Sequence, residues 1–332
     1  MVAPLSGDFA PYGAHIQRGV ELALEDLKQR NVHARLIAED GCLPSQVRSA
    51  LTKLTSQDKI LALVGSYCVI GMVASEQILE ETKTIGFQTS GGTREILSAG
   101  DYLFTTAAKT SDEAASLAEH AYRELGARKV AILYLTTQWG EEYNTAFSDR
   151  FKNLGGTITG VATNPIGQNS FRAELSKLRS GEPDTLLIVH LASTLGIAIK
   201  EAREGGFKGQ FLATTDAEEE SVITEAGKFA EGLTLVAPEP KLDSERMRAF
   251  ASAFVAKFAQ PPHPLSRHAY DATLLAASAL AKCNGERGCA KNKIYQTRDY
   301  SGASGDFSIN RDGGTTRTFV AKLVRDGRFV KK

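Results

Sequence analysis

Apolar residues recur along the chain with two alternating spacings. Ile16, Val20, Ala23 and Leu27 lie three or four positions apart, whereas residues 60–64 form an unbroken apolar run. The first spacing is typical of a helix with one buried face, and the second is typical of a buried strand. Because the two patterns alternate over most of the chain, the sequence predicts an α/β protein with parallel sheets covered by helices on both faces.

The alternation falls into two successive sets. In the first, strands are predicted at 35–39, 60–64 and 84–87, with a helix at about 71–81. The second begins near Thr110, with helices at about 111–125 and 141–154 and strands at 130–135, 185–191, 210–214 and 232–236. Two such sets predict two doubly wound lobes. The later helices, 244–258 and 266–282, lack strands between them and could return to the first lobe. The last strand, 318–324, must join one sheet or the other, so the pattern allows several crossings between the lobes.

The composition and charge of the chain argue against several classes of function. Of 332 residues, 42% are hydrophobic, and 39 Lys and Arg balance 39 Asp and Glu. This balance argues against nucleic-acid binding and against a polybasic membrane-surface protein. No apolar run approaches the roughly 20 residues needed to span a bilayer.

The four cysteines form two candidate pairs. Cys42 and Cys68 each follow a predicted strand, and adjacent parallel strands would bring their ends within disulfide reach. Cys283 and Cys289 bracket a polar loop that would close a small ring. Two disulfides imply an oxidising compartment, whereas four free thiols would fit a cytosolic protein. No Cys-x-x-Cys pair is present, so no zinc site is predicted.

Motifs for catalysis are absent. The sequence lacks a nucleophile elbow, a phosphate-binding loop, a zincin helix and a dinucleotide fingerprint after the first strand. It therefore predicts no enzyme activity, metal or cofactor. His190 lies near the carboxyl end of a predicted strand, where open α/β sheets place ligands. We expect it to be structural or to line a pocket, and an enzyme that uses His190 with Asp216 is the weakest alternative.

Residues 90–93 form a glycine-rich loop between strand 84–87 and a short predicted helix at 94–97. Exposed backbone N–H groups and the Thr93 hydroxyl would make a cradle for a carboxylate or a phosphate. The alternative is an ordinary turn in which Thr93 caps the helix.

Trp139 is the only tryptophan of the chain and follows strand 130–135. In such a loop, the indole would either cover a ligand in a cleft or simply pack on the surface.

A series of short motifs runs through the chain in a fixed order. It opens with APLSG at 3–7 and YG at 12–13, continues with EDGC at 39–42, VG at 64–65, GGT at 91–93, WG at 139–140 and EG at 231–232, and ends with SGASGDF at 301–307 and DG at 312–313. In order and spacing, the motifs resemble those of the branched-chain amino-acid-binding proteins. These are type I periplasmic solute-binding proteins of ABC transporters.

The resemblance implies two lobes joined by three crossovers, with a solute held in a cleft between them. The lobes are expected at 1–107 with 239–312 and at 110–237 with 316–332, and the crossovers near 106–110, 238–241 and 310–317. Cys42 and Cys68 match a cysteine pair that is disulfide-bonded in some members, which supports the pairing above.

The family's ligand positions carry over to residues of both lobes. In the first lobe, Gly91 and Thr93 would hold the ligand carboxylate, and Tyr12 would line the site. In the second, Trp139 takes the place of a lining aromatic residue, and Asp216 lies near the acidic residue that receives the ammonium group. A shift of one residue would put Thr215 in that acidic position instead.

Tyr67, Val69, Gly92 and His190 complete the expected site. Val69 stands where the family has a carboxylate-binding serine, so it offers a backbone N–H but no hydroxyl. Leu191, beside His190, stands where a tyrosine is expected. Because a buried amino acid needs both of its charges satisfied, these departures indicate an unusual solute, such as an aromatic or aliphatic acid or an amide.

The sequence therefore predicts a monomeric, non-enzymatic receptor that captures a small carboxylate-bearing solute for the permease subunits of an ABC importer. We expect no nucleic-acid partner. We expect a periplasmic protein, or an extracellular membrane-anchored one, with a signal peptide that is absent from this chain. The alternative is a sensory or regulatory relative with the same fold that binds an amide or an acid.

Overall fold

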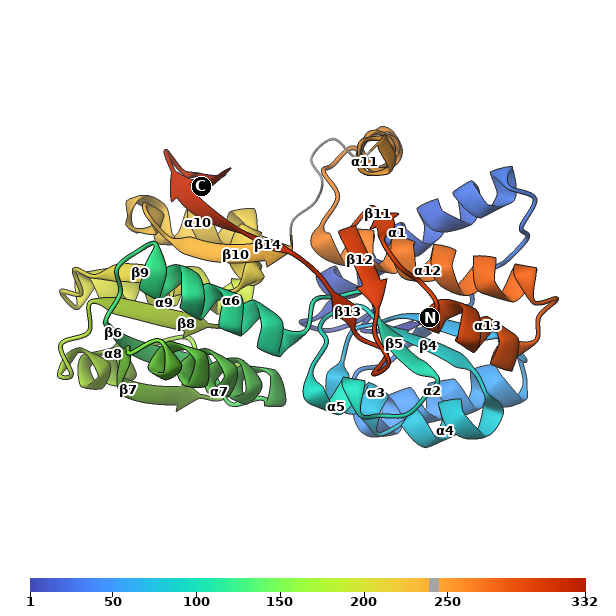
Figure 1. Cartoon of the computed structure of the whole chain (residues 1–332), viewed down its shortest axis with the longest axis horizontal. Helices are drawn as coiled ribbons and strands as arrows, with labels where there is room; N and C mark the ends of the chain where they lie inside the picture. The colour runs from blue at the N-terminus through green and yellow to red at the C-terminus, as the bar shows by residue number, and fades with distance from the viewer. Residues whose placement is uncertain (239–244) are drawn as a thin grey trace. The chain divides into compact units, whose positions relative to one another are not determined.

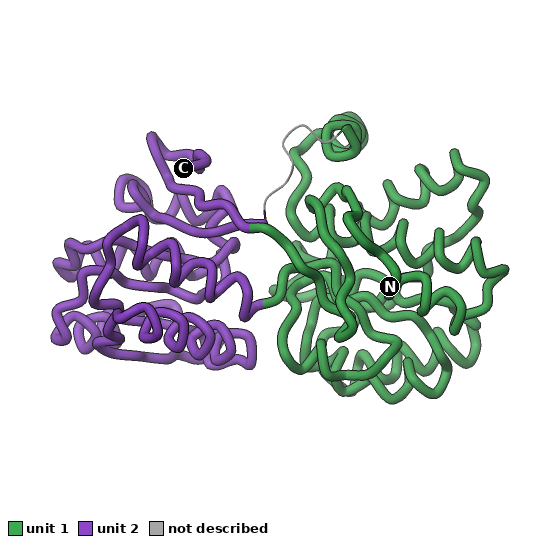
Figure 2. The backbone as a smooth tube through the Cα atoms, in the orientation of Figure 1, with its two compact units in different colours: residues 1–109, 239–318 green, residues 110–238, 319–332 purple. Residues whose placement is uncertain are grey.

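The computed structural model describes residues 1–238 and 245–332. The chain forms two compact units, each assembled from separate stretches of sequence. Unit 1 comprises Met1–Lys109 and Glu239–Thr318, and unit 2 comprises Thr110–Pro238 and Phe319–Lys332 (Figure 2). The chain therefore passes from one unit to the other three times.

Short parallel strands form the centre of unit 1 (Figure 1). The strands β3 (Ala62–Ser66), β4 (Ile85–Gln88) and β5 (Leu103–Thr105) pair in that order, all in parallel. Beside β3 lies β1 (Val2–Ala3), which pairs in parallel with β2 (Glu39–Asp40). A separate antiparallel sheet contains β11 (Tyr300–Gly302), β12 (Gly305–Ile309) and β13 (Thr315–Thr316).

The helices of unit 1 cover these strands. They are α1 (Ala10–Gln29), α2 (Pro44–Ser56), α3 (Val69–Val73), α4 (Glu76–Thr82), α5 (Arg94–Leu97), α11 (Glu245–Phe258), α12 (Pro264–Lys282) and α13 (Arg287–Tyr295). The predicted stripe of α1 is buried, with Ile16, Val20 and Leu27 at most 1% exposed. At Gly19 a side chain would meet the Ser266 carbonyl oxygen at 2.1 Å, so glycine permits the close packing of α1 on α12.

Unit 2 contains one seven-stranded sheet with the order β15-β14-β10-β9-β8-β6-β7. Its strands are β6 (Lys129–Leu135), β7 (Thr157–Asn164), β8 (Thr185–Val189), β9 (Gln210–Ala213), β10 (Thr234–Pro238), β14 (Phe319–Arg325) and β15 (Arg328–Lys331). The first five are parallel, and β14 and β15 add an antiparallel hairpin at one edge.

The helices of unit 2 precede these parallel strands or connect them. They are α6 (Thr110–Arg123), α7 (Gln138–Asn153), α8 (Arg172–Arg179), α9 (Ala192–Glu204) and α10 (Glu220–Ala226), with 3-10 turns η1 (Thr215–Glu218) and η2 (Gly227–Ala230). Buried Tyr143, Phe147 and Phe151 of α7 pack against α6 and one face of the sheet. The predicted α/β class and the doubly wound parallel arrangement are confirmed.

Several predicted elements are displaced. The strand predicted at 35–39 is wrong, because only Glu39–Asp40 pairs with β1. The helix predicted at 71–81 is broken into α3 and α4. The strand predicted to continue to Leu191 ends at Val189, so His190 lies just beyond β8.

The last crossing also differs from the expected one. Residues 310–317 were expected to span it, but Thr315 and Thr316 pair with β12 as β13, so the chain stays in unit 1 until Thr318. The expected second crossing at 238–241 lies outside the described residues beyond Pro238. The last strand, β14, joins unit 2 beside β10.

Both cysteine pairs are disulfide-bonded, Cys42 with Cys68 and Cys283 with Cys289. The two strands that precede Cys42 and Cys68 are not neighbours, because β1 lies between β2 and β3. The loop that the second pair brackets is shorter than expected, because α13 already begins at Arg287. Among the described helices, none is both long and apolar enough to cross a membrane.

Candidate functional site

In unit 1, the loops that follow β3 and β4 are joined by a hydrogen-bond network. Gln88, the last residue of β4, donates from Nε2 to the Tyr67 carbonyl and to Ser90 Oγ, both at 2.6 Å. Thr89 donates to the Ser66 carbonyl through both its backbone N–H, at 2.9 Å, and its hydroxyl, at 2.8 Å. The backbone after β3 and the glycine-rich loop are therefore held as one rigid strand-end surface.

Thr93 lies on this surface with an unused hydroxyl. It occupies the N-cap position of α5, but its side chain accepts no capping hydrogen bond. Thr93 is fully buried, and its Oγ1 has no hydrogen-bond partner among the described residues. Since a buried hydroxyl without a partner costs free energy, Thr93 is a candidate for a group that a ligand completes. The alternative is therefore confirmed in position only, because Thr93 is the N-cap residue of α5 but its hydroxyl makes no capping hydrogen bond.

The two glycines before Thr93 differ in what surrounds them. A side chain on Gly91 would meet no atom within 4 Å, so open space lies above this residue. Gly92 instead donates its N–H to the Ala108 carbonyl at 3.1 Å, and a side chain there would meet that oxygen at 3.0 Å. Gly91 is thus the glycine that a ligand can approach, whereas the Gly92 N–H already has a partner.

Tyr12 and Tyr67 stack beside these loops, with ring centroids 5.0 Å apart and planes inclined by 9°. Phe9 packs at a tilt against both rings, with centroids at 6.3 and 6.1 Å. Val69, half-buried, begins helix α3 directly after Cys68. Cys68 lies between Tyr67 and Val69, and its disulfide with Cys42 restrains the backbone there. Tyr67 and Val69 therefore keep defined positions at the end of β3.

In unit 2, Trp139 lies in the first turn of α7. Thr137 caps this helix by accepting a hydrogen bond from the Gly140 N–H at 3.1 Å. The half-buried indole contacts Tyr143 edge-on at a centroid distance of 6.3 Å.

His190 is fully buried at the end of β8. Its Nδ1 lies 3.2 Å from Thr194 Oγ1, and its ring meets Phe171 edge-on at 4.8 Å. Its Nε2 has no hydrogen-bond partner among the described residues. Burial lowers the pKa of His190 to about 4, so the ring is neutral at neutral pH.

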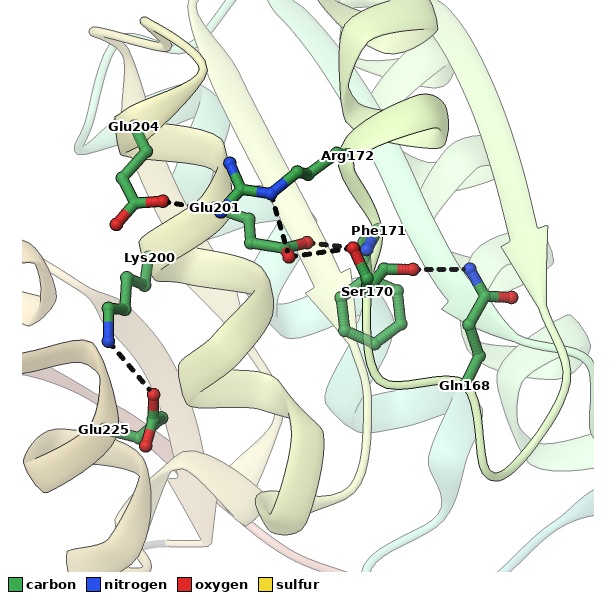
Figure 3. Close-up of polar contacts among 8 residues, drawn as sticks. All are labelled: Gln168, Ser170, Phe171, Arg172, Lys200, Glu201, Glu204 and Glu225. Atoms are coloured by element: carbon green, nitrogen blue, oxygen red, sulfur yellow. Dashed lines mark hydrogen bonds and ion pairs between the residues drawn. The ribbon is translucent and has the colours of Figure 1, made fainter.

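Figure 3 shows how the segment that carries Phe171 is fastened to α9. The carboxylate of Glu201 accepts hydrogen bonds from Ser170 Oγ at 2.9 Å and from the Phe171 N–H at 2.6 Å. Arg172 adds an ion pair at 3.3 Å. Because Phe171 in turn packs on His190, Glu201 helps to position one wall of the His190 surroundings.

Asp216 lies in the turn η1 after β9 and accepts a hydrogen bond from Thr214 Oγ1 at 3.2 Å. Glu113 of α6 lies nearby, where it accepts bonds from the Tyr143 hydroxyl at 3.4 Å and from the Thr215 backbone. Burial, followed by the Asp216 charge, raises the pKa of Glu113 to about 8. Unit 2 therefore presents two neighbouring carboxyl groups, of which Glu113 keeps its proton at neutral pH.

The structure thus places the expected residues in two groups, which are Tyr12, Tyr67, Val69, Gly91, Gly92 and Thr93 in unit 1, and Trp139, His190 and Asp216 in unit 2. Sequence reasoning missed Gln88 and Glu113. Glu113 lies in the first turn of the helix predicted at 111–125, where an acidic residue is ordinary, and Gln88 is a polar residue that ends an apolar run. Within residues 1–238 and 245–332, no group of His, Cys, Asp or Glu side chains is arranged to hold a metal ion.

Comparison with known proteins shows a family match over almost the whole chain. A family model described as "Periplasmic binding protein" matches residues 1–328. The chain is 22% identical to the leucine-specific-binding protein of Salmonella typhimurium over 288 residues, which cover 85% of this chain and 78% of that protein.

Solved structures share the same fold. A leucine-binding protein from Thermotoga maritima superposes with a TM-score of 0.89 at 23% identity, covering 100% of this chain and 96% of that one. A solute-binding protein of an ABC transporter from R. palustris, in complex with benzoate, superposes with a TM-score of 0.87 at 19% identity, covering 99% and 93% of the two chains.

Proposed function

Because the chain belongs to the periplasmic binding protein family, we propose that it is the solute-binding receptor of an ABC importer and that its solute carries a carboxylate. The family consists of solute-binding proteins, not enzymes. The predicted resemblance to branched-chain amino-acid-binding proteins is confirmed by the relatives and by the shared fold.

The observation that carries the proposal is the Thr93 hydroxyl. It is buried and has no partner among the described residues, and it follows Gly91, above which space is open. A carboxylate oxygen would accept a hydrogen bond from Thr93 Oγ1. The backbone N–H groups that follow β4 would be further donors to the same carboxylate. Val69, at the neighbouring strand end, contributes backbone and an apolar side chain instead of a second hydroxyl. Tyr12 and Tyr67 supply flat apolar surface beside them.

Unit 2 offers solute-binding groups of its own. A solute with an amino group would find the carboxyl groups of Asp216 and Glu113, whereas an aromatic or aliphatic acid would need only apolar surface such as Trp139. His190 is neutral and its Nε2 is unused, so it suits a polar uncharged group better than an anion. The named solutes of the relatives include leucine and benzoate, so both classes belong in the test.

The permease subunits of an ABC importer are the proposed partners, and a monomer is the proposed state of the receptor. Both disulfides favour an oxidising compartment, which agrees with a periplasmic or extracellular location. They weigh against the alternative of a cytosolic sensory relative.

The test is a thermal-shift screen of the whole chain against amino acids, aromatic acids, short aliphatic acids and amides, followed by calorimetry on any solute that binds. A solute at 100 times its Kd should add about 2.7 kcal/mol to the free energy of unfolding. Thr93→Ala should weaken binding of a carboxylate solute by about 1–3 kcal/mol, since it removes a buried hydrogen bond.

The same variant should not lower the stability of the solute-free protein, because the Thr93 hydroxyl contributes no hydrogen bond there. Thr273→Ala is the matched control. The Thr273 hydroxyl is also buried but donates to the Ala269 carbonyl at 2.7 Å, so its loss should lower the Tm without changing solute affinity. Unchanged affinity in Thr93→Ala would remove Thr93 from the site, and binding of uncharged amides alone would exclude the carboxylate.

A further inference from the structure

A pocket lies in unit 1, and none of its lining residues belongs to the proposed solute site. It has a volume of about 380 Å³, which lies within the range of small-molecule sites. Its walls come from the end of α1, from α11, from the second half of α12, and from α13 and the residues that follow it. Helix α12 contacts both α1 and α13 (Figure 1). The lining residues therefore come from helices that pack on one another.

Four cationic side chains line this pocket, and each comes from a different element. They are Arg30, Arg246, Lys282 and Lys293. Among the described residues that line the pocket, none is Asp or Glu. Of the four, Arg30 has an ion pair, with Asp26 at 3.2 Å, whereas Lys282 and Lys293 form no ion pair with any described residue. The pocket therefore carries two lysine charges, those of Lys282 and Lys293, that no acidic side chain of the described residues pairs.

The floor of the pocket is apolar. Leu274, Ala279 and Ile294 are buried there, and half-buried Leu275 completes the surface. Arg246 lies over the ring of Tyr300 at 5.1 Å and donates to the Ser301 carbonyl at 2.9 Å, so this cation is held in place at the wall. Positive groups around an apolar floor match a ligand that has several negative charges on a compact apolar body.

We propose that this pocket binds a small organic anion with two or more negative charges. The charges would pair with Lys282, Lys293 and Arg246, and the carbon body would lie on the floor formed by α12 and α13. A single carboxylate would leave most of the cations unpaired. The pocket therefore selects polyanions and differs in this respect from the solute site at the strand ends.

Calorimetry with benzene-1,3,5-tricarboxylate as the probe tests the proposal on the whole chain. The wild-type protein should bind the probe at about 50 mM salt and more weakly as salt screens the cations. Lys282→Glu and Lys293→Glu should each weaken binding by about fivefold, because each replaces one attraction by a repulsion. Ser278→Phe keeps every charge but fills the pocket from α12, and it should abolish binding.

Lys177→Glu is the matched control. Lys177 is an exposed lysine in the last turn of α8 in unit 2. Lys282 and Lys293 are likewise exposed lysines in the last turns of α12 and α13. It should leave the Kd unchanged. The proposal is overturned if the wild-type protein does not bind the probe, or if binding survives Ser278→Phe. Loss of binding in Thr93→Ala but not in the lysine variants would assign the probe to the solute site and would equally overturn it.

Discussion

At the scale of single residues, the candidate site is marked by polar groups whose states are unusual. Thr93 has a buried hydroxyl without a partner, His190 is kept neutral by burial, and Glu113 keeps a proton that a solvated glutamate would lose. The states of Thr93 and Glu113 cost stability in the solute-free protein at neutral pH, the buried Nε2 of His190 has no partner among the described residues, and groups of this kind are concentrated at functional sites. These three residues therefore support the proposed solute site more strongly than the aromatic residues do.

Glu113 leads to a prediction about pH. Its folded-state pKa of about 8 lies above the ordinary value of 4.5, so the folded protein binds this proton more tightly than the unfolded chain does. Stability from Glu113 is therefore full below about pH 4.5 and is lost as the pH rises toward 8. Glu113→Gln should remove this part of the pH dependence and make the protein more stable than wild type at about pH 9.

Urea unfolding at about pH 6 and about pH 9 measures this difference. Glu124→Gln, an exposed position just after the end of the same helix, is the control and should follow the wild-type curve. If wild type and Glu113→Gln lose the same stability between the two pH values, Glu113 is ionised in the folded protein and the proximity to Asp216 has no energetic consequence.

The residues that sequence reasoning found and those it missed differ in a physical way. Thr93 and Gly91 were found because a glycine-rich turn after an apolar strand has a local signature. Glu113 was missed because its environment depends on Asp216, about a hundred positions later in the chain. A first-turn acid is usually explained by the helix dipole, so nothing local distinguishes it.

At the scale of elements, periodicity predicted the long helices and the buried strands of unit 2. The strand β6, predicted at 130–135, begins one residue earlier and ends where predicted. In contrast, β7 was not predicted, because as an edge strand it mixes exposed and half-buried residues. The stretch 35–39 was misinterpreted as a strand. Only Glu39 and the next residue, Asp40, pair with β1. Pairing depends on tertiary context that a local pattern does not contain.

The loop between β7 and α8 depends on one side chain of α9. Glu201, 8% exposed, accepts hydrogen bonds from Ser170 and from the Phe171 backbone (Figure 3). Glu201→Ala should lower the free energy of unfolding by about 1–3 kcal/mol, because it leaves a buried N–H without a partner. Urea unfolding monitored by circular dichroism measures the loss.

Glu204 provides the matched control one turn later on the same helix. It pairs with the same Arg172 at 2.8 Å, but its side chain is 39% exposed and that of Arg172 is 61% exposed. Glu204→Ala should cost less than about 1 kcal/mol, as is usual for a surface ion pair. Equal losses in the two variants would mean that Glu201 acts only through its charge and not through the Phe171 backbone.

At the scale of the whole molecule, the two units differ in how they are stabilised. Unit 1 contains all four cysteines of the chain and both disulfides, together with several short strands. Unit 2 has no cysteine and is built around one seven-stranded sheet. Since a disulfide stabilises mainly by restricting the unfolded chain, reduction should act on unit 1 alone.

The two disulfides should differ in their contribution. Cys42–Cys68 joins residues 26 positions apart, and Cys283–Cys289 joins residues 6 positions apart. By loop-closure entropy, removal of the first should cost about 3.5 kcal/mol and removal of the second about 2 kcal/mol. The paired variants Cys42→Ser with Cys68→Ser, and Cys283→Ser with Cys289→Ser, allow each loss to be measured separately. Hydrogen exchange should show faster exchange in unit 1 and unchanged exchange in unit 2.

Only the first of these disulfides should also affect solute binding. Cys68 lies between Tyr67 and Val69, so its loss frees the strand-end segment that the proposed site uses, whereas Cys289 lies in α13. The double variant Cys42→Ser with Cys68→Ser should therefore bind the solute more weakly. The double variant Cys283→Ser with Cys289→Ser should bind it with unchanged affinity. Equal affinities in both pairs, measured by calorimetry, would show that Tyr67 and Val69 keep their positions without the disulfide or make no contact with the solute.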